Sequence, residues 1–278
     1  MTAATVSMHP TRQPLPTGPA VTGAEILSLA GRRLRHLRRA PGRLVGVIMN
    51  PLVTMIAMGY LFKNSIVVPG GGSYPEYLMA GAAAQVGLAS VGPTAISVAL
   101  DLRGGLVDRF RSLPISRIAV LIGHTLADLV LSLLALAVVL AVGLGLGWRV
   151  HTSVLPVLAG VGVLAAFIFV MLWVGVLVGL VCRSPETIDS VGALVVVLFS
   201  FLSSAFLAVS QYPGWLRPVA AWNPVSSVTN QVRLLWGDPV APASGFTGHQ
   251  PGVVAMVSLF ALLSVTTVLS FRRYRAAT

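Results

Sequence analysis

Six long apolar runs constrain the fold of this chain more than any other feature. Each has about 20 residues or more, the length that a helix needs to cross roughly 30 Å of hydrocarbon. Backbone polar groups must be satisfied inside lipid, so such runs favour helices over open strands. The runs lie at about 44–62, 77–100, 119–147, 154–182, 189–210 and 251–271. The sequence therefore predicts an all-α polytopic membrane protein with six transmembrane helices.

Composition supports this fold class and argues against several others. Hydrophobic residues make up 55% of the 278 residues and charged residues 10%, and the mean hydropathy of +0.86 is outside the range of soluble domains. The formal net charge of +11 does not indicate nucleic-acid binding, because the basic residues lie between apolar runs rather than on a polar face. Cys182 is the only cysteine, which excludes an intramolecular disulfide.

The N-terminal segment divides into two parts. Residues 1–22 mix Thr, Pro, Ser, Ala and Gly without a period, so we expect a disordered tail. In 23–41, apolar residues recur at helical spacing between basic ones, which predicts an amphipathic helix on the membrane surface; the alternative is a basic flank that forms no helix. Its arginines are Arg32, Arg33, Arg35, Arg38 and Arg39. The first 40 residues contain no apolar core of a signal peptide, so the first run is expected to be an uncleaved anchor, and 42–278 to be one transmembrane domain.

The distribution of basic residues predicts the orientation. Fifteen of the 19 Lys and Arg residues fall in the segments that share a side with the N-terminus, and only Lys63, Arg149, Arg217 and Arg233 fall on the other side. Because Lys and Arg concentrate in cytoplasmic loops, we expect both termini in the cytoplasm and the protein in the cell membrane.

Three further features concern the packing of the spans. Small residues dominate 77–100, which predicts a packing helix near the middle of the protein or at a subunit contact. Trp148, near the end of the third run, is predicted to be an interfacial anchor. In the external loop 211–250, apolar residues recur at helical spacing after Asn223 and up to Gly237, which predicts a short amphipathic helix at the outer interface.

Motifs for catalysis are missing from the sequence. A Walker A loop needs a lysine followed by Ser or Thr, whereas the only lysine, Lys63, precedes Asn64. No Cys or His pair has the spacing of a metal site, and no serine in the apolar runs lies in a Gly-x-Ser-x-Gly elbow. We therefore expect no enzyme activity, metal or cofactor in this chain; any ATPase, with its ATP and Mg, must be a partner subunit.

His124 and Asp128 are the polar pair that the third run contains. Four residues separate them, which places them on one face of a helix. An aspartate at the bilayer centre costs up to roughly 3 kcal/mol, so it is a functional candidate by default. Two interpretations stay open: a structural pair near the interface, and a proton-coupling site.

The segment 101–117, "DLRGGLVDRFRSLPISR", interrupts the apolar chain with six charged residues. Burying them in lipid would cost on the order of 15 kcal/mol, so the segment must lie outside it. Leu102, Leu106, Phe110 and Leu113 nevertheless form an apolar stripe. This pattern predicts a cytoplasmic amphipathic helix that docks on a soluble partner; the alternative is a plain loop helix lying on the surface.

This segment resembles the cytoplasmic loop between the second and third spans of ABC-2-type transporter permeases, especially daunorubicin-resistance-like drug exporters. In that family, the loop has an acidic residue and Arg, a Gly, then Arg, Pro and a Ser-Arg pair. Asp101, Arg103, Gly105, Arg109, Pro114, Ser116 and Arg117 occupy those places. The stretch 223–237 is similar to the family's sequence before the last span, with Asn223, Pro224, Arg233 and Gly237 in matching places.

The resemblance implies a half-transporter. Family permeases pair as two six-span subunits with two ATP-binding subunits, and the loop helix transmits closure of the ATPase dimer to the spans. It implies a homodimer of this chain in the bilayer and a coupling role, not catalysis, for the loop. The residues that this resemblance implies contact the ATPase, or support that contact, are Asp101, Arg103, Gly105, Asp108, Arg109, Arg111 and Pro114.

The expected function is export of a hydrophobic or amphiphilic, drug-like compound. We expect apolar residues to line its path, since few charges are available to bind an ion. The candidates are Met79, Trp173, Phe199, Phe201 and Phe206. An exporter of lipids or lipid-linked glycans is the alternative within transport, and a non-transporting assembly factor or an intramembrane enzyme is the alternative from another class.

Overall fold

The computed structural model describes residues 41–62, 65–68, 71–103, 117–182, 184–241 and 245–277, and this part of the chain is helical and contains no strand. The long helices are α2 (Pro41–Leu61), α3 (Tyr74–Arg103), α5 (Arg117–Gly145), α6 (Val154–Val181), α7 (Pro185–Phe201) and α11 (Pro251–Ala277). The short ones are η1 (Val209–Gln211), α8 (Arg217–Trp222), α9 (Pro224–Trp236) and α10 (Phe246–His249).

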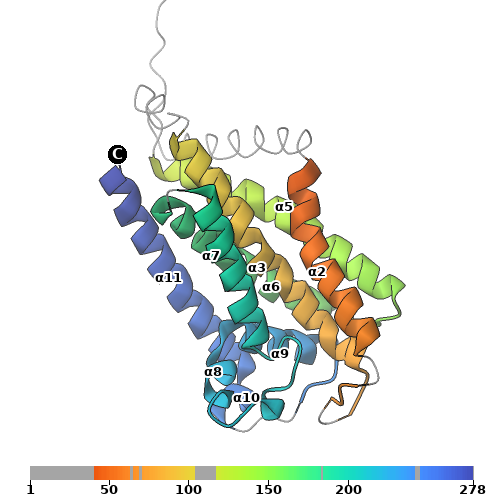
Figure 1. Ribbon diagram of the computed structural model, residues 1–278. Helices are drawn as coiled ribbons and strands as arrows, with labels where there is room; N and C mark the ends of the chain where they lie inside the picture. The colour runs from red at the N-terminus through yellow and green to blue at the C-terminus, as the bar shows by residue number, and fades with distance from the viewer. Residues whose placement is uncertain are drawn as a thin grey trace, which may run out of the picture.

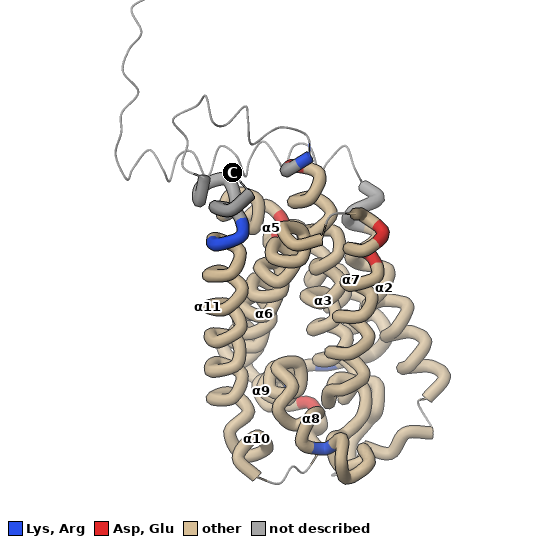
Figure 2. Tube along the Cα trace, turned by 60° about the vertical axis from the view of Figure 1, so that its left-hand side comes forward, with Lys and Arg blue, Asp and Glu red and all other residues tan. Residues whose placement is uncertain are grey.

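The long helices form an elongated bundle, and α8, α9 and α10 gather at the end away from the C-terminus, which we call the α9 end (Figure 1). Charged residues lie mainly toward the two ends of the bundle (Figure 2). Four helices are long and apolar enough to cross a membrane: α3, α5, α6 and α11. The apolar part of α2, Val45–Leu61, is shorter. The described residues thus give a membrane protein, while six spans remain a prediction.

Helix α3 lies at the centre of the bundle and contacts α2, α5, α6, α7 and α9. Its small residues allow this, because they let neighbouring backbones approach closely. A methyl group on Gly87 would come within 2.9 Å of the Phe167 ring of α6, and one on Gly179 of α6 would come within 3.0 Å of Ala95 Cα. The prediction of a packing helix in the middle of the protein is confirmed.

The fifth predicted span differs from the structure at both ends. The prediction was 189–210, but α7 begins at Pro185, because the Ser184 hydroxyl caps the helix by accepting from Thr187 N at 3.1 Å and Pro suits the first turn. The helix then ends at Phe201.

The early end of α7 has a tertiary cause. The last carbonyls of a helix have no partner within it, and here side chains from the following segment bind them. Tyr212 Oη donates to Phe201 O at 2.7 Å, and Asn223 Nδ2 donates to Leu202 O at 2.7 Å. The apolar residues after Phe201 therefore fold back as turns instead of prolonging the helix.

The helix predicted before Gly237 is confirmed as α9, and it packs inside the bundle rather than lying on its surface. Asn223 caps its start by accepting from Val225 N at 2.9 Å, and Gly237 ends it in the left-handed conformation with φ of 74°. Eight of its residues are buried, against α3, α6 and α11. The reason is that a polar residue on the inner face, Arg233, finds partners inside the bundle.

Trp148 is not an outward interfacial anchor. It is buried, its ring lies 5.0 Å from that of Trp236, and its indole nitrogen donates to Asp238 Oδ1 at 2.9 Å. A tryptophan with a buried N–H needs such a partner, so the ring faces the segment after α9 rather than lipid.

Candidate functional site

A row of polar side chains joins α3 to α5 inside the apolar bundle; we call it the α3–α5 polar seam. Its centre is Asp128, whose side chain is 2% exposed. Thr94 Oγ1 of α3 donates to Asp128 Oδ2 at 2.8 Å, and His124 Nδ1 lies 3.4 Å from the same oxygen. The predicted pairing of His124 with Asp128 on one helical face is therefore confirmed, and α3 supplies the third partner.

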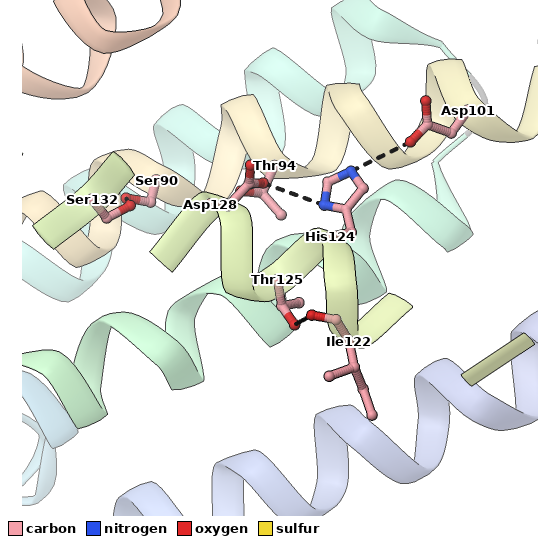
Figure 3. Close-up of polar contacts among 8 residues, drawn as sticks. All are labelled: Ser90, Thr94, Asp101, Ile122, His124, Thr125, Asp128 and Ser132. Carbon is pink, nitrogen blue, oxygen red and sulfur yellow. Dashed lines mark hydrogen bonds and ion pairs between the residues drawn. The ribbon is translucent and has the colours of Figure 1, made fainter. Parts of the chain in front are cut away.

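The imidazole of His124 also reaches the last turn of α3. Its Nε2 atom lies 3.5 Å from Asp101 Oδ2, so the ring stands between two carboxylates from different helices (Figure 3). A protonated imidazole has a donor on each side, and in that state it can bond both carboxylates at once. Sequence spacing could not predict this contact, because Asp101 and His124 belong to different helices.

Two serines extend the seam toward the middle of the bundle. Ser90 Oγ of α3 and Ser132 Oγ of α5 are 2.8 Å apart, and Ser90 Oγ lies 2.7 Å from Val86 O (Figure 3). A hydroxyl has one hydrogen, so Ser90 donates to its own helix and accepts from Ser132. Hydrogen bonds of this kind hold membrane helices together.

The position of the seam relates it to the predicted coupling segment. Asp101 lies two residues before the end of α3 at Arg103, and α5 begins at Arg117 with His124 two turns later. The seam therefore fastens together the two helices that enter and leave 104–116. Asp101 is partly exposed and Arg103 is exposed.

All of the other predicted coupling residues lie outside the described part of the chain. These are Gly105, Asp108, Arg109, Arg111 and Pro114. The arginines of the predicted interfacial helix, at 32, 33, 35, 38 and 39, also lie outside it.

The predicted path residues occupy different environments. Met79, Trp173 and Phe206 are buried within one subunit, Trp173 with its ring 5.8 Å from that of Phe271. Phe199 is half-buried, and Phe201 at the end of α7 is 49% exposed. Of this set, Phe201 is the side chain most open to a bound compound in a single subunit.

The burial of an arginine at the α9 end is the main feature that the sequence reasoning missed. The Arg233 side chain is fully buried, and its guanidinium lies 3.6 Å from the centre of the Tyr77 ring of α3. Its Nε donates to Tyr77 O at 2.9 Å, Nη1 to Asn230 Oδ1 at 2.9 Å, and Nη2 to Ser204 O at 2.9 Å and Ala205 O at 3.0 Å. No carboxylate lies within 4 Å of it among the described residues. The spacing in the sequence could have indicated this burial, because position 233 falls on the same face of α9 as Thr229 and Trp236, which are buried.

Asp238, just after α9, adds a titratable group to this end. It is buried, and burial raises its pKa to about 6, although the Trp148 indole N–H and the charge of Arg233 pull the pKa in the opposite direction. Because Trp148 lies in the connection between α5 and α6, Asp238 links that connection to the end of α9. Among the described residues, no group of three His, Cys, Asp or Glu side chains could hold a metal ion.

Comparison with known proteins identifies the family. Residues 24–236 match the model of the ABC-2 type transporter family, which is most of the chain. The chain belongs to the ABC-2 type transporter family. Permeases of this family are the membrane component of the transporter, and the ATPase is a separate subunit. The resemblance to ABC-2-type transporter permeases is thereby confirmed.

Several relatives are similar to this chain over about three quarters of their length or more. A daunorubicin resistance ABC transporter permease protein, DrrB1 of Streptomyces coeruleorubidus, is 29% identical over 249 residues, 87% of this chain and 85% of the relative. A probable doxorubicin resistance ABC transporter permease protein, DrrC of Mycobacterium tuberculosis, is 26% identical over 265 residues, 93% and 94% of the two chains. The putative transport permease ycf38 of Porphyra purpurea is 24% identical over 222 residues, 77% of this chain and 74% of the relative.

Proposed function

We propose that this ABC-2 permease is the membrane subunit of an ATP-driven exporter that moves a hydrophobic or amphiphilic, drug-like compound outward. The observation that carries the proposal is the likeness to drug-resistance permeases over 85% or more of both chains in two relatives. The apolar walls of the bundle agree with such a substrate, since few charged side chains are present to bind an ion or a sugar acid.

The ATPase is expected to act on segment 101–117. Helices α3 and α5 flank this segment, and the α3–α5 polar seam couples their ends through His124, Asp101 and Asp128. A push on the segment would therefore move α3 and α5 together rather than separating them. Because α3 contacts five other helices, its displacement would reach most of the bundle.

The assembly that fits this role contains two permease copies and two ATP-binding subunits, with ATP and Mg bound by the latter. The permease pair is expected to be a homodimer in the cell membrane. The concentration of Lys and Arg in alternate segments supports six spans with both termini in the cytoplasm. In this orientation, the coupling segment faces the ATPase and the α9 end faces outward.

Transport by inside-out vesicles tests the proposal. The permease is produced together with its ATP-binding subunit, and ATP-dependent uptake of doxorubicin is followed by fluorescence quenching. We expect uptake that requires ATP and is lost in the double variant Asp108→Ala, Arg109→Ala, while Arg149→Gln, on the other side of the predicted topology, behaves as the wild type.

Two results would contradict the proposal. One is a permease that purifies without any ATPase and supports no ATP-dependent uptake. The other is a double variant that retains both the bound ATPase and the uptake, since the coupling segment would then have no role. Uptake of a fluorescent lipid in place of doxorubicin would assign the transporter to lipid export instead.

A further inference from the structure

A pocket of about 370 Å³ opens at the α9 end, between α8, α9 and α10. Its volume is within the range of small-ligand sites. The inner part is polar, with Ser204, Ser226, Ser227 and Asn230, while Arg217, Trp222 and Phe246 belong to the outer part, being exposed. Figure 1 shows how α8, α9 and α10 meet there. This combination of a polar interior and an aromatic rim is typical of a site for an amphiphile.

The pocket has two free groups of hydrogen-bond donors, on Arg217 and on Asn230. Arg217 uses Nε to donate to Tyr212 O at 2.9 Å, and its two Nη atoms make no hydrogen bond within the described residues. The Asn230 oxygen already accepts from Ser204 and Arg233, so what it offers the pocket is its NH₂ group. Ser226 and Ser227 donate their hydroxyl hydrogens to Ala220 O and Pro224 O, so towards a ligand they can only accept. A ligand group that uses the free donors of Arg217 and Asn230 must therefore carry acceptor oxygens.

The charge of the pocket has one sign. None of the lining residues is acidic, and Arg217 is the charged one among them. Behind the inner wall lies Arg233, which donates to the carbonyl oxygens of Tyr77 and Ser204 and to the side chain of Asn230, three residues that line the pocket. No carboxylate lies within 4 Å of Arg233 among the described residues, so its direct hydrogen-bond partners are carbonyl and amide oxygens. The pocket therefore favours an anion.

The surroundings of the pocket suit a molecule that also has an apolar part. The Trp222 side chain is 64% exposed, and exposed aromatic rings are typical of membrane interfaces. Helix α10 contacts α11, whose Met256, Val257 and Phe260 present apolar surface outward. An acyl chain can lie against this surface while its headgroup occupies the pocket.

We propose that this pocket binds the phosphate headgroup of an anionic phospholipid, with Arg217 and Asn230 as donors to the phosphate. The proposal concerns a lipid held by the permease alone, so it does not depend on the exported substrate or on the ATPase. A bound phosphate would also lie near the buried charge of Arg233 and would thus stabilise α9 in its position between α3, α6 and α11.

Lipid binding to the purified full-length permease tests the proposal. Phosphatidylglycerol and phosphatidylcholine with identical acyl chains are titrated separately, and the fraction of protein carrying one lipid is measured by native mass spectrometry. Both lipids carry the phosphate, but phosphatidylcholine also carries a choline cation that the charge of Arg217 repels. We therefore expect phosphatidylglycerol to bind about tenfold more tightly, which corresponds to about 1.4 kcal/mol. Arg217→Gln should abolish this preference.

Two control variants separate charge at this site from charge elsewhere and from folding. Arg217→Lys loses the hydrogen bond to Tyr212 O but keeps the cation, so it should retain the preference for phosphatidylglycerol. Arg149→Gln removes a cation from the turn between α5 and α6 and should leave the preference intact. Equal binding of the two lipids by the wild type, or equal losses in Arg217→Gln and Arg149→Gln, would overturn the proposal.

A competition experiment distinguishes the lipid from a free anion. Millimolar inorganic phosphate is added to the permease carrying phosphatidylglycerol. Retention of the lipid supports a site that binds the headgroup and the apolar part of the lipid together. Displacement of the lipid by phosphate would assign the pocket to a soluble anion and refute the lipid proposal.

Discussion

For the buried Arg233, we expect the chemically more similar substitution to be the more destabilising one. We expect Arg233→Lys to be less stable than Arg233→Met. The guanidinium is buried at 0% exposure and donates to four oxygens, those of Tyr77, Ser204, Ala205 and the Asn230 side chain. The two substitutions differ in whether a cation remains among these oxygens.

The cost of Arg233→Met can be estimated from the partners it leaves. Ser204 O still accepts from Tyr77 Oη at 2.9 Å, and the Asn230 oxygen still accepts from Ser204 Oγ at 3.0 Å. Ala205 O keeps no other hydrogen bond within the described residues. One buried carbonyl without a donor costs about 1–3 kcal/mol, and the loss is offset in part because a charge no longer has to be desolvated.

Arg233→Lys keeps the charge but not the geometry. An ammonium places its three donors around one point, whereas the planar guanidinium donates along two edges, so the lysine leaves oxygens unpaired and stays a poorly compensated buried cation. The part of the cost that comes from burying the charge has an upper limit of about 5 kcal/mol at pH 7, the free energy of deprotonating an amine with a reference pKa of about 10.4. The unpaired oxygens add to this cost.

Thermal melting of the purified full-length chain in detergent, followed by fluorescence-detected size exclusion, gives the order. A buried lysine has a lower pKa in the folded state than in the unfolded state, so the unfolded state binds more protons and stability rises with pH. Arg233→Lys should therefore gain stability between pH 7 and about pH 9.5 relative to Arg233→Met. Arg149→Met, an exposed change, is the control. A lysine variant as stable as the wild type, or more stable than the methionine variant at pH 7, would refute the reasoning.

Three further predictions concern other parts of the bundle. Gly179→Ala should lower the free energy of unfolding by about 1–3 kcal/mol, because the added methyl group forces α6 away from Ala95. Gly162→Ala on the same helix has nothing within 4 Å of the added methyl group and should be neutral or stabilising. Equal melting temperatures of the two variants would contradict the close packing. Asp128→Asn can still accept the hydrogen bond from Thr94 and should fold normally, whereas Asp128→Leu should lose about 1–3 kcal/mol of unfolding free energy. If both variants were destabilised equally in a melting assay, the carboxylate charge itself would be required. The folded pKa of Asp238 is about 6 against an ordinary 3.8, so the stability that this group contributes falls as pH rises between these values. Asp238→Asn should therefore be more stable than the wild type at pH 7 by up to about 3 kcal/mol, and equal to it at pH 4. A pH-independent difference in melting would exclude this titration.

The local elements of the fold could be predicted from the sequence where the signal is itself local. Apolar runs of sufficient length predicted the positions of α2, α3, α5, α6 and α11. The Asn-Pro start and the Gly end predicted α9 to within its observed bounds. Capping and hydrophobic length act within a few residues of the chain, so the sequence carries these signals directly.

The candidate site could be predicted only in part, for a related reason. The i,i+4 spacing of His124 and Asp128 predicted their pairing, but the bonds from Thr94 and the approach of Asp101 depend on the pairing of α3 with α5. Likewise, Arg233 was counted among the external basic residues, because its position in the sequence does not reveal that carbonyls of Tyr77, Ser204 and Ala205 surround it.

The sequence by itself determined that this chain is a helical membrane protein, the order of its long helices and its family. Hydrophobic length and motif spacing are properties of contiguous residues, and no packing is needed to read them. Only the tertiary structure decided where α7 ends, that α9 is buried rather than lying on the surface, and which polar groups meet across α3 and α5. Each of these depends on a backbone or side-chain group finding a hydrogen-bond partner far away in the chain, and such partners exist only once the helices have packed.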